Sequence, residues 1–188
     1  MRRLLAIVLL CTGAIPAAGA EVGGTAKSGG KPVQYAVIWL DAPGAPPFVQ
    51  TKPVVIGQRN LDFDPRVVAV RVGTKVDFPN NDKVFHNVFS FRDGKKFDLG
   101  MYPVGTSKPV VFDKAGLSRI FCEVHPHMAA YVMAVDSPYF SVSDDHGVFA
   151  IPGVPAGTYT YHAWRPGGHE LTGTVVVGAG QAFEIRWP

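Results

Sequence analysis

The segment Phe121–Met128 reads Phe-Cys-Glu-Val-His-Pro-His-Met, and the fold and chemistry of the chain follow from it. Cys122 is followed by His125 and then by Met128, each three positions after the last. A thiolate, an imidazole and a thioether this close together suit a soft or borderline metal, and copper above all. The spacing fits a strand end and a tight loop that turns the three side chains toward one point. The segment therefore predicts three ligands of a copper site.

A second interpretation of Cys122 has to be weighed. A solitary cysteine is often a small buried hydrophobic residue, and a His-Pro pair is often a surface turn. An unpaired thiol outside the cytosol, however, is open to oxidation unless something holds it. The metal interpretation is therefore favoured if the protein is exported, and the N-terminus bears on that question.

The N-terminus has the composition of an export signal. Residues 1–3 are Met-Arg-Arg, a positive start, and Leu4–Cys11 is a short apolar run. Ala18–Ala20 has the small-x-small form of a signal-peptidase site. The apolar run is shorter than the roughly 20 residues that a membrane span needs. We therefore expect residues 1–20 to be a cleaved signal peptide and the protein to be periplasmic, without a membrane span.

Cleavage near Ala20 leaves a mature chain that starts near Glu21 and keeps one cysteine, Cys122, which excludes an internal disulfide. Lipid attachment at Cys11 is disfavoured, because Leu10 before it is bulkier than a lipobox tolerates. Removing the two arginines of the signal from the 18 Lys and Arg leaves 16 against 15 Asp and Glu, a net charge of +1. This balance is not the basic footprint of a nucleic-acid binder.

The rest of the chain has the pattern of an all-β protein. Its 21 Gly and 16 Pro suit a fold with many turns. Valines occupy every second position at 68, 70 and 72, and the alternation resumes at Val76 and Phe78. This period of two indicates strands, and no stretch with a period of 3.6 residues is longer than two helical turns.

The composition also divides the chain into segments. Residues 21–41 read as a hairpin around a glycine-rich turn at 27–31, and the Pro-rich residues 42–53 read as a linker. Residues 54–136 carry the dense strand pattern and the copper segment, and residues 137–188 carry four further strands. Four strands alone would leave a sheet edge and an apolar face uncovered. We therefore expect the N-terminal hairpin and the C-terminal strands to form one small sandwich, with the copper domain inserted between them.

A blue-copper site combines two imidazoles and a thiolate with a weak axial methionine, so one distant histidine is still missing. His86 is the best candidate, because it follows a strand and a polar loop. Asn87 beside it can hydrogen-bond across to the cysteine loop and clamp the two ligand segments together. His127 competes with His125 for the loop position, but the spacing to Met128 favours His125.

The remaining polar residues rank lower as ligands. Glu123 should point away from the face that Cys122 occupies, and His146, His162 and His169 read as solvent-facing positions in the second sandwich. Paired carboxylates, a Ser-His-Asp arrangement and a phosphate-binding glycine loop are not evident in a convincing context. We therefore expect a protein that is not an enzyme.

Residues 54–135 carry four motifs in register, namely Phe63-x-Pro65, Val70-x-Val72-Gly73-Thr74-x-Val76-x-Phe78-x-Asn80, His86-Asn87-Val88 and Cys122-x2-His125-x2-Met128. Together they resemble the cupredoxins, the plastocyanin/azurin/amicyanin-like copper proteins, and the short ligand loop is similar to that of amicyanin. The resemblance implies an eight-stranded Greek-key sandwich that binds one type 1 copper for electron transfer. It also implies that His86, Cys122 and His125 are the equatorial ligands and that Met128 is the axial one.

The C-terminal segment resembles a carboxypeptidase regulatory-like (transthyretin-like) β-sandwich through its Asp145-x-Gly147-x-Phe149-x-Ile151 pattern. Residues 24–41 resemble the first hairpin of the same module. The mature chain as a whole is similar to exported proteins of the methylamine-utilisation type. One departure is that Ser118–Phe121, the strand before the cysteine, lacks the tyrosines of many cupredoxins, and this leaves the partner-facing chemistry open.

These observations predict a monomeric periplasmic electron carrier with one type 1 copper and an unidentified redox partner. The expected electron exit is the edge of His125, where Pro126 and Ala129 leave an apolar contact patch. A copper-binding or copper-delivery protein would use the same ligands and stays open as an alternative. A second alternative is a module that binds a glycan or an envelope protein through aromatic residues of the second sandwich, namely Tyr159, Tyr161 and Trp164.

Overall fold

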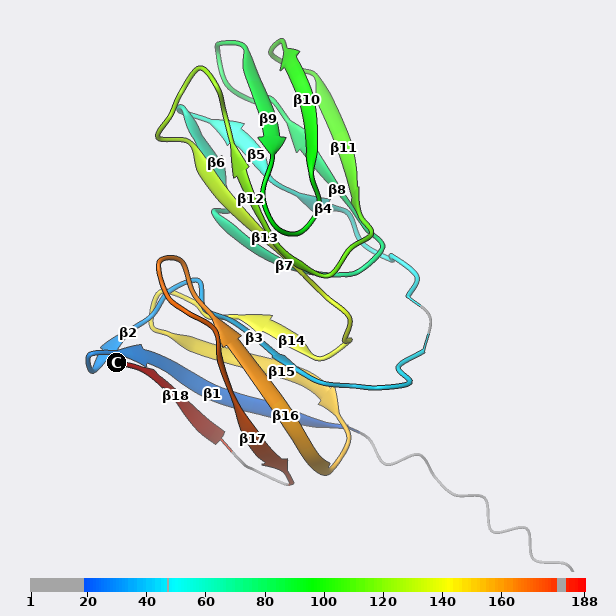
Figure 1. The fold of residues 1–188 in the computed structure, drawn as a ribbon, viewed down its shortest axis with the longest axis vertical. Helices are drawn as coiled ribbons and strands as arrows, with labels where there is room; N and C mark the ends of the chain where they lie inside the picture. The colour runs from blue at the N-terminus through cyan, green and yellow to red at the C-terminus, as the bar shows by residue number, and fades with distance from the viewer. Residues whose placement is uncertain (1–18, 47, 179–181) are drawn as a thin grey trace, which may run out of the picture.

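The computed structural model describes residues 19–46, 48–178 and 182–188, and every helix or strand assigned within these ranges is a β-strand (Figure 1). The strands form an upper and a lower sandwich, stacked along the long axis of the molecule. In the described part of the chain, no helix has the length and apolar character to cross a membrane. The predicted signal peptide falls mostly on residues 1–18, outside the described residues.

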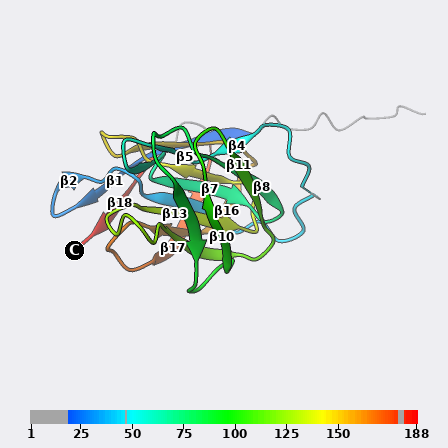
Figure 2. The same ribbon diagram turned by 90° about the horizontal axis from the view of Figure 1, so that it is seen from above.

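The upper sandwich has one sheet of strand order β10-β9-β12-β13-β7, one of order β11-β8-β4, and a β5–β6 hairpin. This non-sequential order is that of a Greek-key sandwich. Seen from above, its green strands lie in front of the blue and orange strands of the lower sandwich (Figure 2). Its strands are β4 (Val54–Val55), β5 (Gly57–Arg59), β6 (Asp62–Asp64), β7 (Val67–Arg71), β8 (Thr74–Pro79), β9 (His86–Ser90), β10 (Phe97–Tyr102), β11 (Ser107–Phe112), β12 (Gly116–Phe121) and β13 (Ala129–Val135).

The described part of this sandwich has ten strands where the family resemblance implies eight. The count rises because β4 and β5 are separated only by Ile56, whose N–H still donates to the Asp77 carbonyl oxygen of β8 at 3.0 Å. It also rises because the short β6 pairs with β5 as a separate hairpin.

The alternation predicted for the valine-rich strand is present in β7. Val68 and Val70 pack into the core between the two sheets, whereas Val67 and Ala69 point to the opposite face. Successive side chains of a strand point to opposite sides, so one strand serves two apolar contacts. The prediction of an all-β fold is confirmed.

The lower sandwich joins the two ends of the chain. Its strand β1 pairs antiparallel with β15 and parallel with β18. The other sheet has the order β14-β3-β16-β17, so that β3 pairs with strands about a hundred residues away. The upper sandwich lies in the chain between β3 and β14. The strands are β1 (Ala20–Ser28), β2 (Lys31–Pro32), β3 (Val37–Leu40), β14 (Phe140–Val142), β15 (Val148–Val154), β16 (Gly157–Trp164), β17 (Leu171–Val177) and β18 (Ala182–Trp187).

The N-terminal segment differs from the single hairpin expected for residues 21–41. Only the last two residues of β1 pair with β2, across a turn in which Gly29 and Gly30 both have positive φ. Tyr35 then takes a left-handed φ of 65°, and β3 lies in the other sheet. The segment therefore contributes a strand to each sheet, because the chain changes direction at Tyr35.

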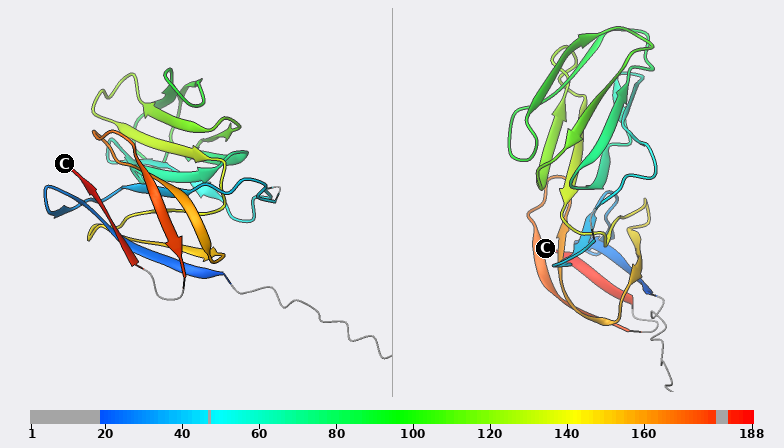
Figure 3. Two further views of the ribbon diagram at one scale, coloured as in Figure 1. Left: turned by 60° about the horizontal axis from the view of Figure 1, so that its bottom comes forward. Right: turned by 90° about the vertical axis from the view of Figure 1, so that its right-hand side faces the viewer.

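The two sandwiches lie one above the other (Figure 3, right), and an apolar interface joins them. The outward face of β7 and β13 packs against side chains of β3, β14 and β16. Trp164 is only 8% exposed, and its ring lies 5.3 Å from the ring of Tyr131. A buried aromatic contact of this kind holds the two sandwiches in one arrangement.

This burial corrects the aromatic surface expected on the lower sandwich. Trp164 is covered by the upper sandwich, so it is not free to touch a glycan or an envelope protein. Tyr159 and Tyr161 pack against the core of the lower sandwich, and the ring of Tyr161 contacts that of Phe183 at 5.5 Å. Trp164 is therefore removed from the expected surface, whereas Tyr159 and Tyr161 are half-buried and keep part of their surface exposed.

Candidate metal centre

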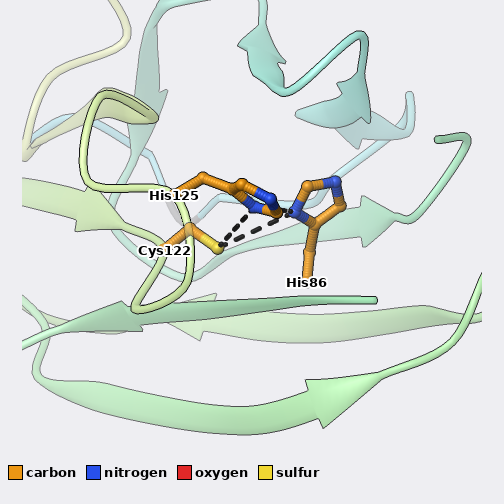
Figure 4. A group of neighbouring side chains, drawn as sticks. All are labelled: His86, Cys122 and His125. Carbon is orange, nitrogen blue, oxygen red and sulfur yellow. Dashed lines mark hydrogen bonds between the residues drawn. The ribbon is translucent and has the colours of Figure 1, made fainter. Parts of the chain in front are cut away.

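Three donor atoms from separate parts of the chain meet at the end of the upper sandwich that lies away from the lower one (Figures 1 and 4). His86 opens β9, Cys122 directly follows β12, and His125 lies in the loop before β13. The Nδ1 atoms of the two histidines are 3.1 Å apart. Sγ of Cys122 lies 3.7 Å from Nδ1 of His86 and 3.8 Å from Nδ1 of His125.

This triangle has the size that a metal ion requires. The centre of a triangle with these sides is about 2.1 Å from each corner. For comparison, the bonds from imidazole nitrogen and thiolate sulfur to a zinc ion are about 2.0–2.3 Å long. Two imidazoles and a thiolate in a trigonal arrangement are the ligand set of blue copper.

Met128 is the fourth residue of the predicted set and ends the ligand loop. It is fully buried in the same core cluster as Cys122. Its N–H donates to the carbonyl oxygen of His125 at 2.9 Å, which closes the loop into a tight turn. His86, Cys122, His125 and Met128 fit a single type 1 copper.

The clamp predicted for Asn87 is confirmed. Asn87 is buried, and its Oδ1 accepts the N–H of Glu123 at 2.8 Å. Its Nδ2 donates to Oδ1 of Asp98 at 3.3 Å, which orients the amide. Because Asn87 and Glu123 adjoin His86 and Cys122 in sequence, this bond ties the two ligand segments together.

His127 takes no part in the triangle. It is exposed, and its Nε2 lies 2.9 Å from the carbonyl oxygen of Leu61, in the tip of the β5–β6 hairpin. The geometry therefore places His125, and not His127, at the ligand position of the loop. Glu123 is exposed, in line with its expected orientation away from the site.

The other histidines lie in the lower sandwich. His146 and His169 are exposed. His162 stacks on Trp39 with ring centroids 5.0 Å apart, and its two ring nitrogens face the carboxylates of Asp41 and Glu170. These contacts are far from the donor triangle, since they belong to the sandwich at the other end of the molecule.

Sequence reasoning missed Asp82, whose carboxylate faces Nε2 of His86, the ring nitrogen outside the donor triangle. Oδ2 of Asp82 lies 3.0 Å from Nε2 of the fully buried His86. The pKa of Asp82 is lowered to about 2, chiefly by a hydrogen bond from the N–H of Leu61 and also by His86, against the opposing effect of burial. An acidic residue four positions before the ligand was the available signal, but such spacing is common in polar loops.

Residues 50–136 match the family of copper binding proteins described as plastocyanin/azurin. The upper sandwich is a cupredoxin domain. Similar solved structures include a purple cupredoxin from Nitrosopumilus maritimus, with 24% identity over 44% of this chain and 99% of that chain and a TM-score of 0.40. Amicyanin from Paracoccus versutus has 25% identity over 46% of this chain and 85% of that chain, with a TM-score of 0.41.

A third similar structure is the copper-containing nitrite reductase from Thermus scotoductus SA-01, with 23% identity and a TM-score of 0.43. The match covers 51% of this chain and 25% of that chain. No curated protein matches the chain.

The lower sandwich matches a different family in its C-terminal part. Residues 135–185 match domain II of polysaccharide lyase family 4. The family that this match names differs from the carboxypeptidase regulatory-like one that the sequence resembles, so that resemblance stays a prediction. The match begins at the last residue of β13 and does not include β1 and β3.

Proposed function

We propose that this protein is a periplasmic type 1 copper protein that carries single electrons by outer-sphere transfer. The observation that supports it is the donor triangle, whose three atoms already lie at metal-binding distances from one centre. Bound there, copper supplies a one-electron redox couple. The periplasmic location rests on the export signal expected in residues 1–20.

The protein's part in this mechanism is to hold the ligands still. His86 and Met128 are fully buried, and Cys122 is 3% exposed. The Asn87 clamp joins the strands that carry His86 and Cys122. Ligands fixed by packing and by hydrogen bonds rearrange little between two oxidation states, which favours rapid electron exchange.

His125 is the expected exit, because it is the half-buried member of the triangle. Large exposed apolar side chains lie in the segments around it, and Pro126 is exposed beside it. Such a patch can exclude water against a redox partner without strong binding. The exposed apolar residues of the loops at this end include Leu61, Val84, Phe85, Val104 and Val124.

The lower sandwich attaches at the opposite end from the ligands and leaves that surface open to a partner. A copper-delivery function would need a site from which the metal can be passed on. The burial of His86, Cys122 and Met128 favours retention, and therefore favours the electron carrier over the delivery protein.

The test is the visible and EPR spectrum of the mature protein loaded with one copper and oxidised. We expect an intense thiolate-to-copper charge-transfer band and the narrow copper hyperfine splitting of a type 1 site. Repeated reduction and reoxidation should leave the copper content unchanged. A colourless protein at full copper occupancy would refute the type 1 assignment, and loss of copper to an acceptor on each cycle would favour delivery.

A further inference from the structure

His86 has a different neighbour at each ring nitrogen. Its Nδ1 faces Cys122 and His125 in the donor triangle, and its Nε2 lies 3.0 Å from Oδ2 of Asp82. The ring is fully buried, so water does not compete for either nitrogen. An ionised carboxylate only accepts hydrogen bonds, so the proton of a neutral His86 belongs on Nε2. Nδ1 is then free to bind a metal.

Asp82 is itself held by several backbone contacts. Its Oδ2 also accepts the N–H of Leu61 at 2.7 Å, and its Oδ1 accepts the N–H of Lys83 at 2.8 Å. Its own N–H donates to Oδ1 of the buried Asn80 at 3.1 Å. The carboxylate therefore has a fixed position relative to His86.

Leu61 connects this carboxylate to the ligand loop. It lies in the two-residue turn of the β5–β6 hairpin, where Asn60 and Leu61 both have positive φ, as a type I′ turn requires. Both of its backbone polar groups have partners beside the donor triangle, the N–H with Asp82 and the carbonyl oxygen with His127. The hairpin tip therefore fixes the position of Asp82.

We propose that Asp82 is a positioning residue for the copper ligand His86, which fixes the Nε2–H tautomer and places a negative charge behind the imidazole. The proposal rests on the proposed copper function. A carboxylate hydrogen-bonded to a ligating histidine orients the ring and makes it a stronger donor. The added charge stabilises Cu(II) more than Cu(I), so Asp82 should lower the reduction potential.

The first measurement uses the metal-free protein, so it does not depend on copper chemistry. Nitrogen-15 NMR of the histidine rings at about pH 8, where a histidine of ordinary pKa is neutral, should show His86 with a protonated Nε2 and a bare Nδ1. Replacing Asp82→Ala should bring the opposite tautomer into the spectrum. A wild-type His86 protonated at Nδ1, or a tautomer unaffected by Asp82→Ala, would overturn the proposal.

The second measurement compares Asp82→Asn with Asp62→Asn in copper-loaded protein. Asp62 is an exposed carboxylate of the β5–β6 hairpin, next to Leu61, and within the described residues its Oδ1 accepts only the N–H of Phe63. Asp82→Asn should weaken Cu(II) binding by about 10–100-fold and weaken Cu(I) binding less. For each factor of ten by which the Cu(II) affinity falls more than the Cu(I) affinity, the reduction potential rises by about 59 mV for this one-electron couple.

The Asp62→Asn variant should change the potential much less, because its charge is in water. Equal shifts in the two variants would show that Asp82 acts only as one more charge, which would overturn the positioning role. Failure of the proposed function would look different. The wild-type protein would then lack the charge-transfer band, while the tautomer of metal-free His86 would still report on Asp82.

Discussion

Ser143 offers a sharp test of the connection between the two ends of the chain. Its buried Oγ accepts the N–H of Ala36 at 2.9 Å and donates to the carbonyl oxygen of Val33 at 2.7 Å. These bonds join segments beside β3 and β14 that are more than a hundred residues apart, on either side of the inserted cupredoxin domain. The substitution Ser143→Ala removes both bonds and leaves little room for water to replace them.

The expected loss of stability follows from these contacts. A buried hydrogen bond contributes about 1 kcal/mol net, and a buried N–H left without an acceptor costs about 1–3 kcal/mol. Losing two bonds and leaving the N–H of Ala36 unpaired should therefore lower the free energy of unfolding of the lower sandwich by about 2–4 kcal/mol. For a domain of this size, each kcal/mol lowers Tm by about 4–8 °C.

Two probes can follow the two domains. The three tryptophans of the chain, Trp39, Trp164 and Trp187, all belong to the lower sandwich. Trp187 packs in its core, whereas Trp39 and Trp164 also pack at the interface, so the fluorescence reports on the unfolding of the lower sandwich and on the loss of that interface. The copper band reports on the cupredoxin domain. We expect Ser143→Ala to shift the fluorescence transition in urea to lower concentration, with a smaller shift of the copper transition.

The matched control is Ser141→Ala, two residues earlier on strand β14. Ser141 is half-buried, and its side chain makes no hydrogen bond within the described residues. Its substitution should change the stability by less than about 0.5 kcal/mol. If Ser143→Ala costs no more than Ser141→Ala, the side chain of Ser143 does not hold the two chain ends together, and the reasoning is wrong.

Four further predictions concern the cupredoxin domain. Cys122→Ser should abolish the charge-transfer band while the far-UV circular dichroism stays unchanged; persistent colour would mean that another residue supplies the sulfur. Met128→Leu should keep the band and raise the potential measured by voltammetry, because an axial methionine tunes the site more than it holds the metal; loss of copper would contradict the axial role. His86→Ala should reduce the copper affinity measured by isothermal titration calorimetry far more than His127→Ala, because only His86 belongs to the triangle; equal losses of affinity would contradict the assignment of His86 as a ligand. Burial raises the pKa of Tyr102 to about 12 against an ordinary value of 10.0, so the unfolded state loses this proton first and stability should fall as the pH rises from about 10 to 12; in Tyr102→Phe the decline in the urea midpoint should be smaller.

Much of this protein follows from local patterns in its sequence. The ligand types and their spacing at Cys122, His125 and Met128 limit the metal, because thiolate, imidazole and thioether donors have their own chemical preferences. The alternation in β7 predicts a strand with two apolar faces, because side chains in a strand alternate. The clamp by Asn87 could be predicted too, since it adjoins His86 in sequence.

Other features depend on contacts between distant segments. No local pattern shows that β1 lies between β15 and β18, that β3 changes sheets after Tyr35, or that Trp164 is covered by Tyr131. The position of Asp82 behind His86 depends on the hairpin tip at Leu61, whose N–H orients the carboxylate. Residue types and spacing determine which chemistry is available, whereas the folded chain decides which atoms meet, because packing and hydrogen bonding act across segments that local periodicity does not relate.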